Sequence, residues 1–174
     1  STKFVSSILV IDDTKLLITT LKNIYLIEWD KKSSTFISQH LKTKDEKLRF
    51  YKSKSIDSKN ILISTNKGFV KLNLSLKGDF LIEVDIQRRI IDFSIDKTNK
   101  VWFLADESLF TFNTNNNTSK NIITDIKNPS SILIDHNNYL WVGTSGNGLY
   151  VSKKVDTEID NVTFIHVTSH ESET

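Results

Sequence analysis

The sequence predicts an all-β protein, because short apolar runs alternate with clusters of turn-forming residues along the chain. The clearest example is the stretch 130–153, which contains three apolar runs and two such clusters. The runs are 131–134, 140–142 and 149–151, and the clusters between them are 135–138 and 145–148. Asn and Asp side chains hydrogen-bond to nearby backbone in turns, and Gly adopts positive φ without a steric penalty. No segment keeps a helical period of 3.6 residues, which argues against an α/β fold.

The same arrangement recurs at a regular spacing, so the chain is a repeat array. The second strand of each unit starts at Leu16, Ile61, Val101 and Leu140, which makes the steps 45, 40 and 39 residues. Four-stranded repeats of this length are typical of β-propeller blades. A β-sandwich or a barrel also has many short strands, but the regular period argues against both. The sequence therefore predicts a β-propeller segment of about four four-stranded antiparallel blades.

The strands of each unit follow from the same pattern. The first unit opens with a strand within 4–11. Second strands are expected at 16–20, 61–65, 101–105 and 140–144, third strands at 24–27, 69–72, 109–112 and 149–151, and fourth strands near 35–41, 79–84, 120–124 and 161–167. We expect one domain over 1–174, with blades at about 4–42, 48–86, 88–125 and 129–168 and a tail at 169–174.

The distribution of apolar residues suggests which strands are central. The runs 61–63 and 101–105 are apolar throughout, as expected for strands covered on both faces. The segment 80–85 begins to alternate between apolar and polar residues, as an outer strand does. The segment 42–58 is charged and has no clear period, so we expect a loop with room for one helical turn.

Composition excludes several classes of protein. The chain has 23 Lys and Arg against 21 Asp and Glu, and this balance gives no argument for a nucleic-acid or membrane partner. No apolar run approaches the roughly 18 residues of a membrane span. The absence of Cys excludes disulfides and thiolate metal sites. The chain contains no Met and shows no secretory signal, and we interpret it as a segment of a longer polypeptide.

One unit carries a motif that points to a family. Its marked positions are Ile132, Asp135, Leu140, Trp141, Val142, Gly143, Thr144, Gly148 and Leu149. This pattern resembles the two-component regulator propeller repeat, although Asn138 or Tyr139 stands where that repeat has a turn glycine. The second unit keeps Asp57, Ile61, Ile63, Thr65 and Gly68, and the third keeps Asp96, Val101, Trp102 and Leu109.

The resemblance implies a role that composition and spacing do not. Repeats of this family form the extracytoplasmic sensor region of bacterial hybrid two-component regulators, ahead of a further β domain, a membrane helix and a histidine kinase. Many members respond to glycans. The resemblance thus implies a periplasmic or extracytoplasmic segment of about four blades, without the kinase parts.

The residues that could suggest chemistry have simpler structural explanations. Trp102 and Trp141 lie in second strands, where the family packs Trp between blades, and Trp29 is also expected to be structural. Asp57, Asp96 and Asp135 precede second strands, and Asx turns explain them without a metal. Of the four His residues (His40, His136, His166 and His170), only the last two have a metal-ligand spacing, at i and i+4, and in a β or tail region this spacing does not bring the side chains together. No Gly-x-Ser-x-Gly motif or nucleophile with a His and Asp partner is found, so we assign no catalytic residue, metal or cofactor.

Topology indicates where a ligand could bind. In a propeller, the loops between strands four and one and between strands two and three emerge on one face, around the axial channel. The candidate ligand-binding residues in these loops are Lys67, Arg88, Arg89, Asp106, Glu107 and Asn147. The pair Arg88–Arg89 is the most suggestive, because guanidinium groups bind carboxylates and sulfates through two hydrogen bonds.

These observations favour a non-catalytic ligand-sensing module, and the resemblance implies an oligosaccharide as its partner. A protein-interaction scaffold is the alternative, and an enzyme is the third possibility. Propellers have about 4–8 blades, so four blades either close on themselves or leave two apolar sheet faces open. Polar capping units are missing at both ends, so we expect self-association or pairing with neighbouring blades of a parent protein.

Overall fold

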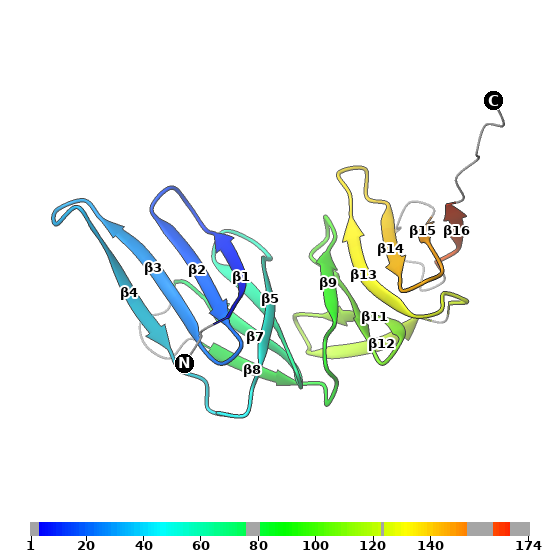
Figure 1. Cartoon of the computed structure of the whole chain (residues 1–174), viewed down its shortest axis with the longest axis horizontal. Coiled ribbons are helices and arrows are strands. Elements are labelled where there is room, and N and C mark those ends of the chain that lie inside the picture. The colour runs from blue at the N-terminus through cyan, green and yellow to red at the C-terminus, as the bar shows by residue number, and fades with distance from the viewer. Residues whose placement is uncertain (1–3, 76–80, 123, 153–161, 168–174) are drawn as a thin grey trace. The chain divides into compact units, whose positions relative to one another are not determined.

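The structure, a computed structural model, describes residues 4–75, 81–122, 124–152 and 162–167 (Figure 1). Sixteen strands in these ranges form four antiparallel sheets of four strands each, and no helix is present among them. The prediction of an all-β fold with four-stranded units is confirmed. In every sheet the strands lie side by side in the order of the chain.

The strands of each sheet are as follows. Sheet 1 contains β1 (Val5–Val10), β2 (Lys15–Thr20), β3 (Ile24–Asp30) and β4 (Thr35–Leu41). Sheet 2 contains β5 (Phe50–Ser55), β6 (Asn60–Thr65), β7 (Gly68–Asn73) and β8 (Leu81–Asp85). Sheet 3 contains β9 (Asp92–Ile95), β10 (Val101–Ala105), β11 (Ser108–Asn113) and β12 (Thr118–Ile122). Sheet 4 contains β13 (Pro129–Ile134), β14 (Leu140–Thr144), β15 (Leu149–Ser152) and β16 (Phe164–Val167).

The segment 42–58 was predicted as a loop, and this is wrong for its second half. Residues Phe50–Ser55 form β5, which pairs with β6 and has an irregular register between Phe50 and Ser53. Phe50 and Ser53 are buried, while the lysines between and after them remain half exposed. Because β5 is held by its neighbours rather than by an apolar run of its own, its sequence lacks a strand period.

Several predicted ends cannot be compared with the structure. Residues 79–80, 123, 161 and the tail 169–174 lie outside the described residues. The chain divides into two compact units, residues 1–90 with sheets 1 and 2 and residues 91–174 with sheets 3 and 4. The expected single domain over 1–174 stays a prediction.

In the first unit, sheets 1 and 2 pack face to face. Leu17 and Ile24 of sheet 1 are buried against Phe50, Ile63 and Val70 of sheet 2. The first strands of the two sheets, β1 and β5, lie beside each other. There the Ser53 backbone N–H donates to Ser7 Oγ at 3.2 Å, and the two serine hydroxyls are 2.8 Å apart.

The second unit repeats this joint between sheets 3 and 4. Trp102 and Leu104 of sheet 3 are buried against Ile132 and Val142 of sheet 4. The Ile132 backbone N–H donates to Asp92 Oδ2 at 3.0 Å. In both units, a polar side chain on the first strand of one sheet therefore accepts a hydrogen bond from the first strand of the next. Each fully buried aliphatic or aromatic side chain adds roughly 1.5–3 kcal/mol to such a joint.

Trp102 and Trp141 have different environments although they occupy the same position in their sheets. Trp102 is completely buried, which confirms its expected place in a joint between sheets. Trp141 is only half buried and lies on the face of sheet 4 that is turned away from sheet 3. Within the described residues no second sheet covers this face, so the inter-blade position expected for Trp141 stays a prediction.

An aspartate organises the hairpin between the first and second strands of every sheet. Oδ1 of Asp57 accepts from the Lys59 N–H at 2.7 Å, and Oδ1 of Asp12 accepts from the Thr14 N–H at 2.8 Å. In sheet 3, Asp96 Oδ1 accepts from the backbone of Thr98 and Lys100. The Asx turns predicted at Asp57, Asp96 and Asp135 are confirmed, and Asp12 forms a similar turn.

In sheets 3 and 4 the same carboxylate also holds the tryptophan of the second strand. Trp102 Nε1 donates to Asp96 Oδ2 at 3.0 Å, and Trp141 Nε1 donates to Asp135 Oδ2 at 2.9 Å. Asn138 has φ +68° and so adopts the left-handed conformation that the family gives to its turn glycine. Each hairpin is thus fixed by one side chain with two acceptor oxygens.

Replacing Asp96 with Ala should destabilise the protein by about 2–4 kcal/mol, because the buried Trp102 N–H and the turn N–H groups would lose their acceptor. Urea denaturation would measure the change in the free energy of unfolding. Asp13→Ala, at an exposed position of the first hairpin, is the control and should stay within about 0.5 kcal/mol. Equal effects of the two substitutions would contradict the role given to Asp96.

The hairpin carboxylates predict how stability depends on pH. The hydrogen bond from the Trp141 indole, with those from the turn backbone, holds the pKa of Asp135 below its ordinary value of 3.8. Hydrogen bonds from the turns lower the pKa of Asp57 and Asp12 in the same direction. A carboxyl group with a lowered folded-state pKa stabilises the fold above pH 3.8 and loses this effect as the pH falls through its folded-state value.

The thermal midpoint should therefore be nearly constant from pH 7 to about pH 5 and should fall below about pH 4. Asp135→Asn removes one of the titrating groups, so its midpoint should fall less over the acidic range. Calorimetry of both proteins across this range is the measurement. A midpoint that rises on acidification would contradict the assignment.

The two tryptophans should differ in their contribution to stability. Trp102→Ala should cost roughly 3–5 kcal/mol, as expected for a completely buried Trp. Trp141→Ala should cost about half as much, because its side chain is half buried in the folded chain. Urea denaturation of the two variants makes the comparison, and a larger loss for Trp141→Ala would show that its exposed face is covered in solution.

Candidate ligand-binding loops

Three loops of the first unit meet at one end of sheets 1 and 2. Two hydrogen bonds between Asn66 and Arg49 join the β4–β5 loop to the β6–β7 turn. The Asn66 N–H donates to the Arg49 backbone carbonyl at 3.1 Å, and the Arg49 N–H donates to the Asn66 side-chain oxygen Oδ1 at 2.7 Å. The segment after β8 joins them through the Ile86 N–H, which donates to the Lys67 carbonyl at 2.8 Å. This end of the unit is therefore a connected surface.

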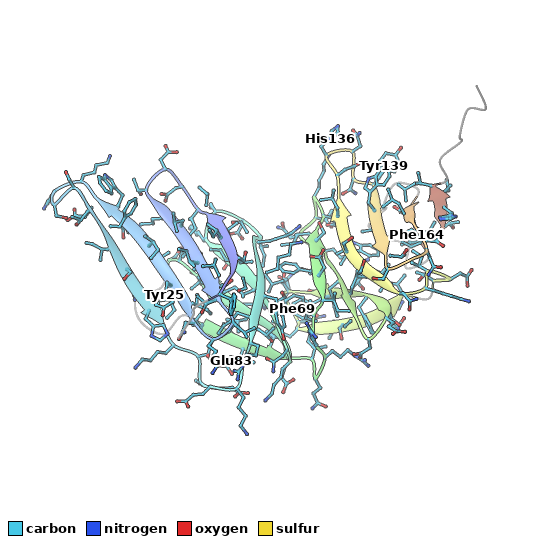
Figure 2. The ribbon with its side chains drawn as sticks, in the orientation of Figure 1. Tyr25, Phe69, Glu83, His136, Tyr139 and Phe164 are labelled. Atoms are coloured by element: carbon cyan, nitrogen blue, oxygen red, sulfur yellow. The ribbon has the colours of Figure 1, made fainter. Side chains whose placement is uncertain are left out.

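Lys67 forms an ion pair within this surface. Its Nζ lies 2.6 Å from Asp45 Oδ2. The hydrogen bond and the attraction between the two groups raise the pKa of Lys67 and lower the pKa of Asp45. Glu83, which projects from β8 (Figure 2), accepts the Asp45 backbone N–H at 3.1 Å. Lys67 is thus engaged with the β4–β5 loop, which leaves less of its charge for a ligand.

Arg89 has a different environment. Its guanidinium carbon lies 5.1 Å from the centre of the Tyr51 ring, and its side chain is exposed. Stacking on an aromatic face fixes the plane of the guanidinium group, and its N–H groups then point outward in that plane. Arg88 beside it is half buried. A fixed cation next to an aromatic ring can bind a carboxylate or sulfate group.

The candidates in the second unit belong mainly to turns. Asp106 and Glu107 both have positive φ, +47° and +58°, and form the two-residue turn between β10 and β11. Both side chains are exposed. The Asn147 side-chain amide donates to the Lys127 carbonyl at 3.3 Å, and the backbone carbonyl oxygen of Asn147 lies 3.0 Å from His166 Nε2. Asn147 therefore ties the β14–β15 turn to its surroundings.

The six predicted residues fall into two groups that belong to different units. Lys67, Arg88 and Arg89 lie in the first unit, on loops that touch one another. The second unit holds Asp106, Glu107 and Asn147. Whether any of the six binds a ligand stays a prediction. Sequence reasoning missed Tyr51 and Asp45, because both lie in the segment interpreted as a solvated loop.

Other chemistry has few candidates among the described residues. No group of three or more His, Asp or Glu side chains there could hold a metal ion. Within the same ranges no helix could cross a lipid bilayer. Trp102 is buried away from the loop ends, so it offers no face for stacking on a sugar.

Comparisons with known proteins agree with the motif in the last unit. The family model of the two-component regulator propeller matches residues 121–146, which include Asp135 and Trp141. No curated protein sequence matches the chain.

Several solved structures have the same fold at low sequence identity. The extracellular domain of a proposed hybrid two-component system from Bacteroides thetaiotaomicron is 18% identical, with a TM-score of 0.64 over 97% of this chain and 22% of that chain. An auxiliary nutrient binding protein from the same organism is 8% identical, with a TM-score of 0.70 over 92% of this chain and 40% of its own. A virginiamycin B lyase from Staphylococcus aureus is 16% identical, with a TM-score of 0.69 over 97% and 57%.

This chain therefore spans between about a fifth and three fifths of the length of these similar proteins. At these identities the likeness concerns the fold, which is that of a β-propeller. The family model adds the repeat itself, in agreement with the resemblance read from the sequence. The chain carries a repeat of the two-component regulator propeller family at residues 121–146, within four-stranded sheets of the β-propeller fold.

Proposed function

We propose that this chain is a non-catalytic ligand-sensing module from the extracytoplasmic sensor region of a hybrid two-component regulator. The observation that carries the proposal is the two-component regulator propeller repeat at 121–146. The similar fold of the extracellular domain of a hybrid two-component system supports it. A location outside the inner membrane belongs to the same proposal.

We further propose that the ligand is an oligosaccharide that carries a carboxylate or sulfate group. Arg89, stacked on Tyr51, supplies a cation for the anionic group, and the ring supplies an apolar face. The loops around them are joined by hydrogen bonds between Asn66 and Arg49, so the surface is formed before the ligand arrives. A preformed surface loses less conformational entropy on binding.

The non-catalytic assignment rests on the pairing of the charged groups at this end. Lys67 and Asp45 neutralise each other, and Glu83 is bonded to backbone N–H groups. A general acid or base needs a pKa near the working pH, whereas the pairing moves the pKa values of Lys67 and Asp45 further from neutrality. A lyase shares the fold, and for that reason the absence of turnover is part of the test.

The test is calorimetric titration of the chain with neutral, uronate-containing and sulfated oligosaccharides. We expect binding of an anionic sugar, and Arg89→Ala should weaken it at least about tenfold, because a charge-assisted hydrogen bond is lost. The control is Lys59→Ala, which removes one exposed positive charge from the β5–β6 hairpin of the same unit. The sugar should be recovered unchanged after incubation.

An absence of binding across the whole panel would refute the sensing proposal. Equal weakening by Arg89→Ala and Lys59→Ala would show that only net charge matters, and the proposed place of binding would be wrong. Conversion of the sugar would favour an enzyme. A protein-interaction scaffold is the second candidate, and the exposed apolar residues on sheets 1 and 4 favour it.

A further inference from the structure

Sheet 1 exposes an apolar face on the side turned away from sheet 2. The strand register places Ile8, Ile18 and Tyr25 in one row across this face, and Trp29 pairs with Phe36 in another. Ile8 is 63% exposed and Phe36 is 66% exposed. Tyr25, labelled on β3 in Figure 2, lies against His40 with 5.2 Å between the ring centres. Continuous apolar surface of this kind marks an interaction site.

Sheet 4 exposes a second apolar face, on the side turned away from sheet 3. Leu133, Trp141, Val151 and Ile165 form one row of side chains across its four strands. Leu133 is 54% exposed and Ile165 is 53% exposed. The two exposed faces are not equivalent. The exposed face of sheet 4 corresponds to the side by which sheets 1 and 3 pack on the sheet that follows them in the chain.

The correspondence follows from the second strands. The second residue of the run that starts at Val101 is Trp102, which packs on the following sheet, and Leu17 does the same in the first unit. Trp141 holds this position in sheet 4. The exposed face of sheet 4 is therefore the face that, in the two internal joints, packs on the following sheet.

The exposed face of sheet 1 has the opposite position. The third residue of the same run, Ile63 in sheet 2 and Val142 in sheet 4, packs on the preceding sheet. Ile18 holds this position in sheet 1. The cross-strand Tyr–His pair also recurs: Tyr150 and His166 lie 4.6 Å apart on the face of sheet 4 that meets sheet 3, and Tyr25 and His40 hold the corresponding places on the open face of sheet 1.

The hydrogen bond between the first strands of two packed sheets also has its acceptor and donor positions on sheets 4 and 1. Ser7 and Asp92 accept from the first strand of the following sheet, and each lies opposite the fourth residue of its second-strand run. Ser131 lies opposite that residue in sheet 4 and so holds the acceptor position. The donor position, held by Ser53 and Ile132 in the two joints, is held by Ile8 in sheet 1.

We propose that sheet 4 of one copy of this chain packs on sheet 1 of a second copy, by the joint that each unit already contains. The occupant is a second copy because one chain carries both halves of the joint. A four-stranded face with about five residues per strand covers roughly 300–400 Å², so one joint buries about 700 Å² in total. A contact of this size falls in the range of weak, reversible interfaces. Because the two faces of the joint differ, the contact between copies is heterologous.

The proposal is independent of ligand binding and is tested by sedimentation equilibrium of the chain across the micromolar range. We expect a reversible dimer. Ile8→Lys on sheet 1 and Ile165→Lys on sheet 4 should each weaken it at least about tenfold, because a charge would be buried without a partner. The control is Ile37→Lys, which changes an isoleucine of sheet 1 that is 55% exposed but lies on the other face. All three positions are exposed, so circular dichroism should be unchanged.

Mixing the two interface variants tests the direction of the contact. The Ile8→Lys copy has an intact sheet 4, and the Ile165→Lys copy has an intact sheet 1, so the mixture can form one undisturbed joint. We expect the mixture to associate more tightly than either variant alone. Each of four other results would overturn the proposal: a monomer at all concentrations, loss of the dimer in only one of the two variants, no gain on mixing, or equal loss in Ile37→Lys.

Discussion

A four-stranded sheet of this protein has two apolar faces, and the fold depends on covering them with other sheets. The joint that does so is built twice, between sheets 1 and 2 and between sheets 3 and 4. Each joint combines a buried apolar cluster with a hydrogen bond at the first strands, donated by Ser53 in one and Ile132 in the other. The apolar cluster supplies most of the stabilisation, because it removes several large side chains from water. The hydrogen bond restricts the register, since only one alignment places a backbone N–H opposite Ser7 or Asp92.

The hairpin aspartates act within each sheet. An apolar face can pack only if the first and second strands keep their register, because a shift of one residue would turn every side chain to the other face. Asp96 prevents this shift by binding the turn backbone through Oδ1 and the Trp102 indole through Oδ2. The same carboxylate therefore connects a local turn to the largest side chain of the inter-sheet cluster. In sheet 1, where the position of Trp102 is occupied by Leu17, the aspartate holds the turn alone.

Much of the fold could be predicted from the sequence, because the second strands are apolar runs at a regular spacing. The first strand β5 could not, since its residues alternate weakly and its place depends on Ser7 in another sheet. The left-handed turn residue at Asn138 could have been inferred, because Asn is the commonest substitute for Gly in that conformation. At the candidate site, the sequence indicated Arg89 but not Tyr51, which lies 38 positions earlier in the chain and meets it only through the fold. Asn147 was a candidate as a loop residue, and its hydrogen bond to the Lys127 carbonyl could not be foreseen because it joins positions 20 residues apart.

The two proposed surfaces use different parts of the sheets. The loop surface lies at the strand ends and is held by backbone hydrogen bonds, such as those of Asn66 and Lys67. The assembly surface lies on the flat faces of sheets 1 and 4, and its energy comes from apolar burial. A charge on Ile8 therefore changes the second surface without altering a contact of the first, and Arg89 can be removed without changing an exposed sheet face. The β4–β5 loop is the exception, because it carries Asp45 of the loop surface and also connects sheet 1 to sheet 2. A ligand that binds this loop can influence the assembly only if its affinities for monomer and dimer differ. The ratio of these two affinities sets the strength of the coupling.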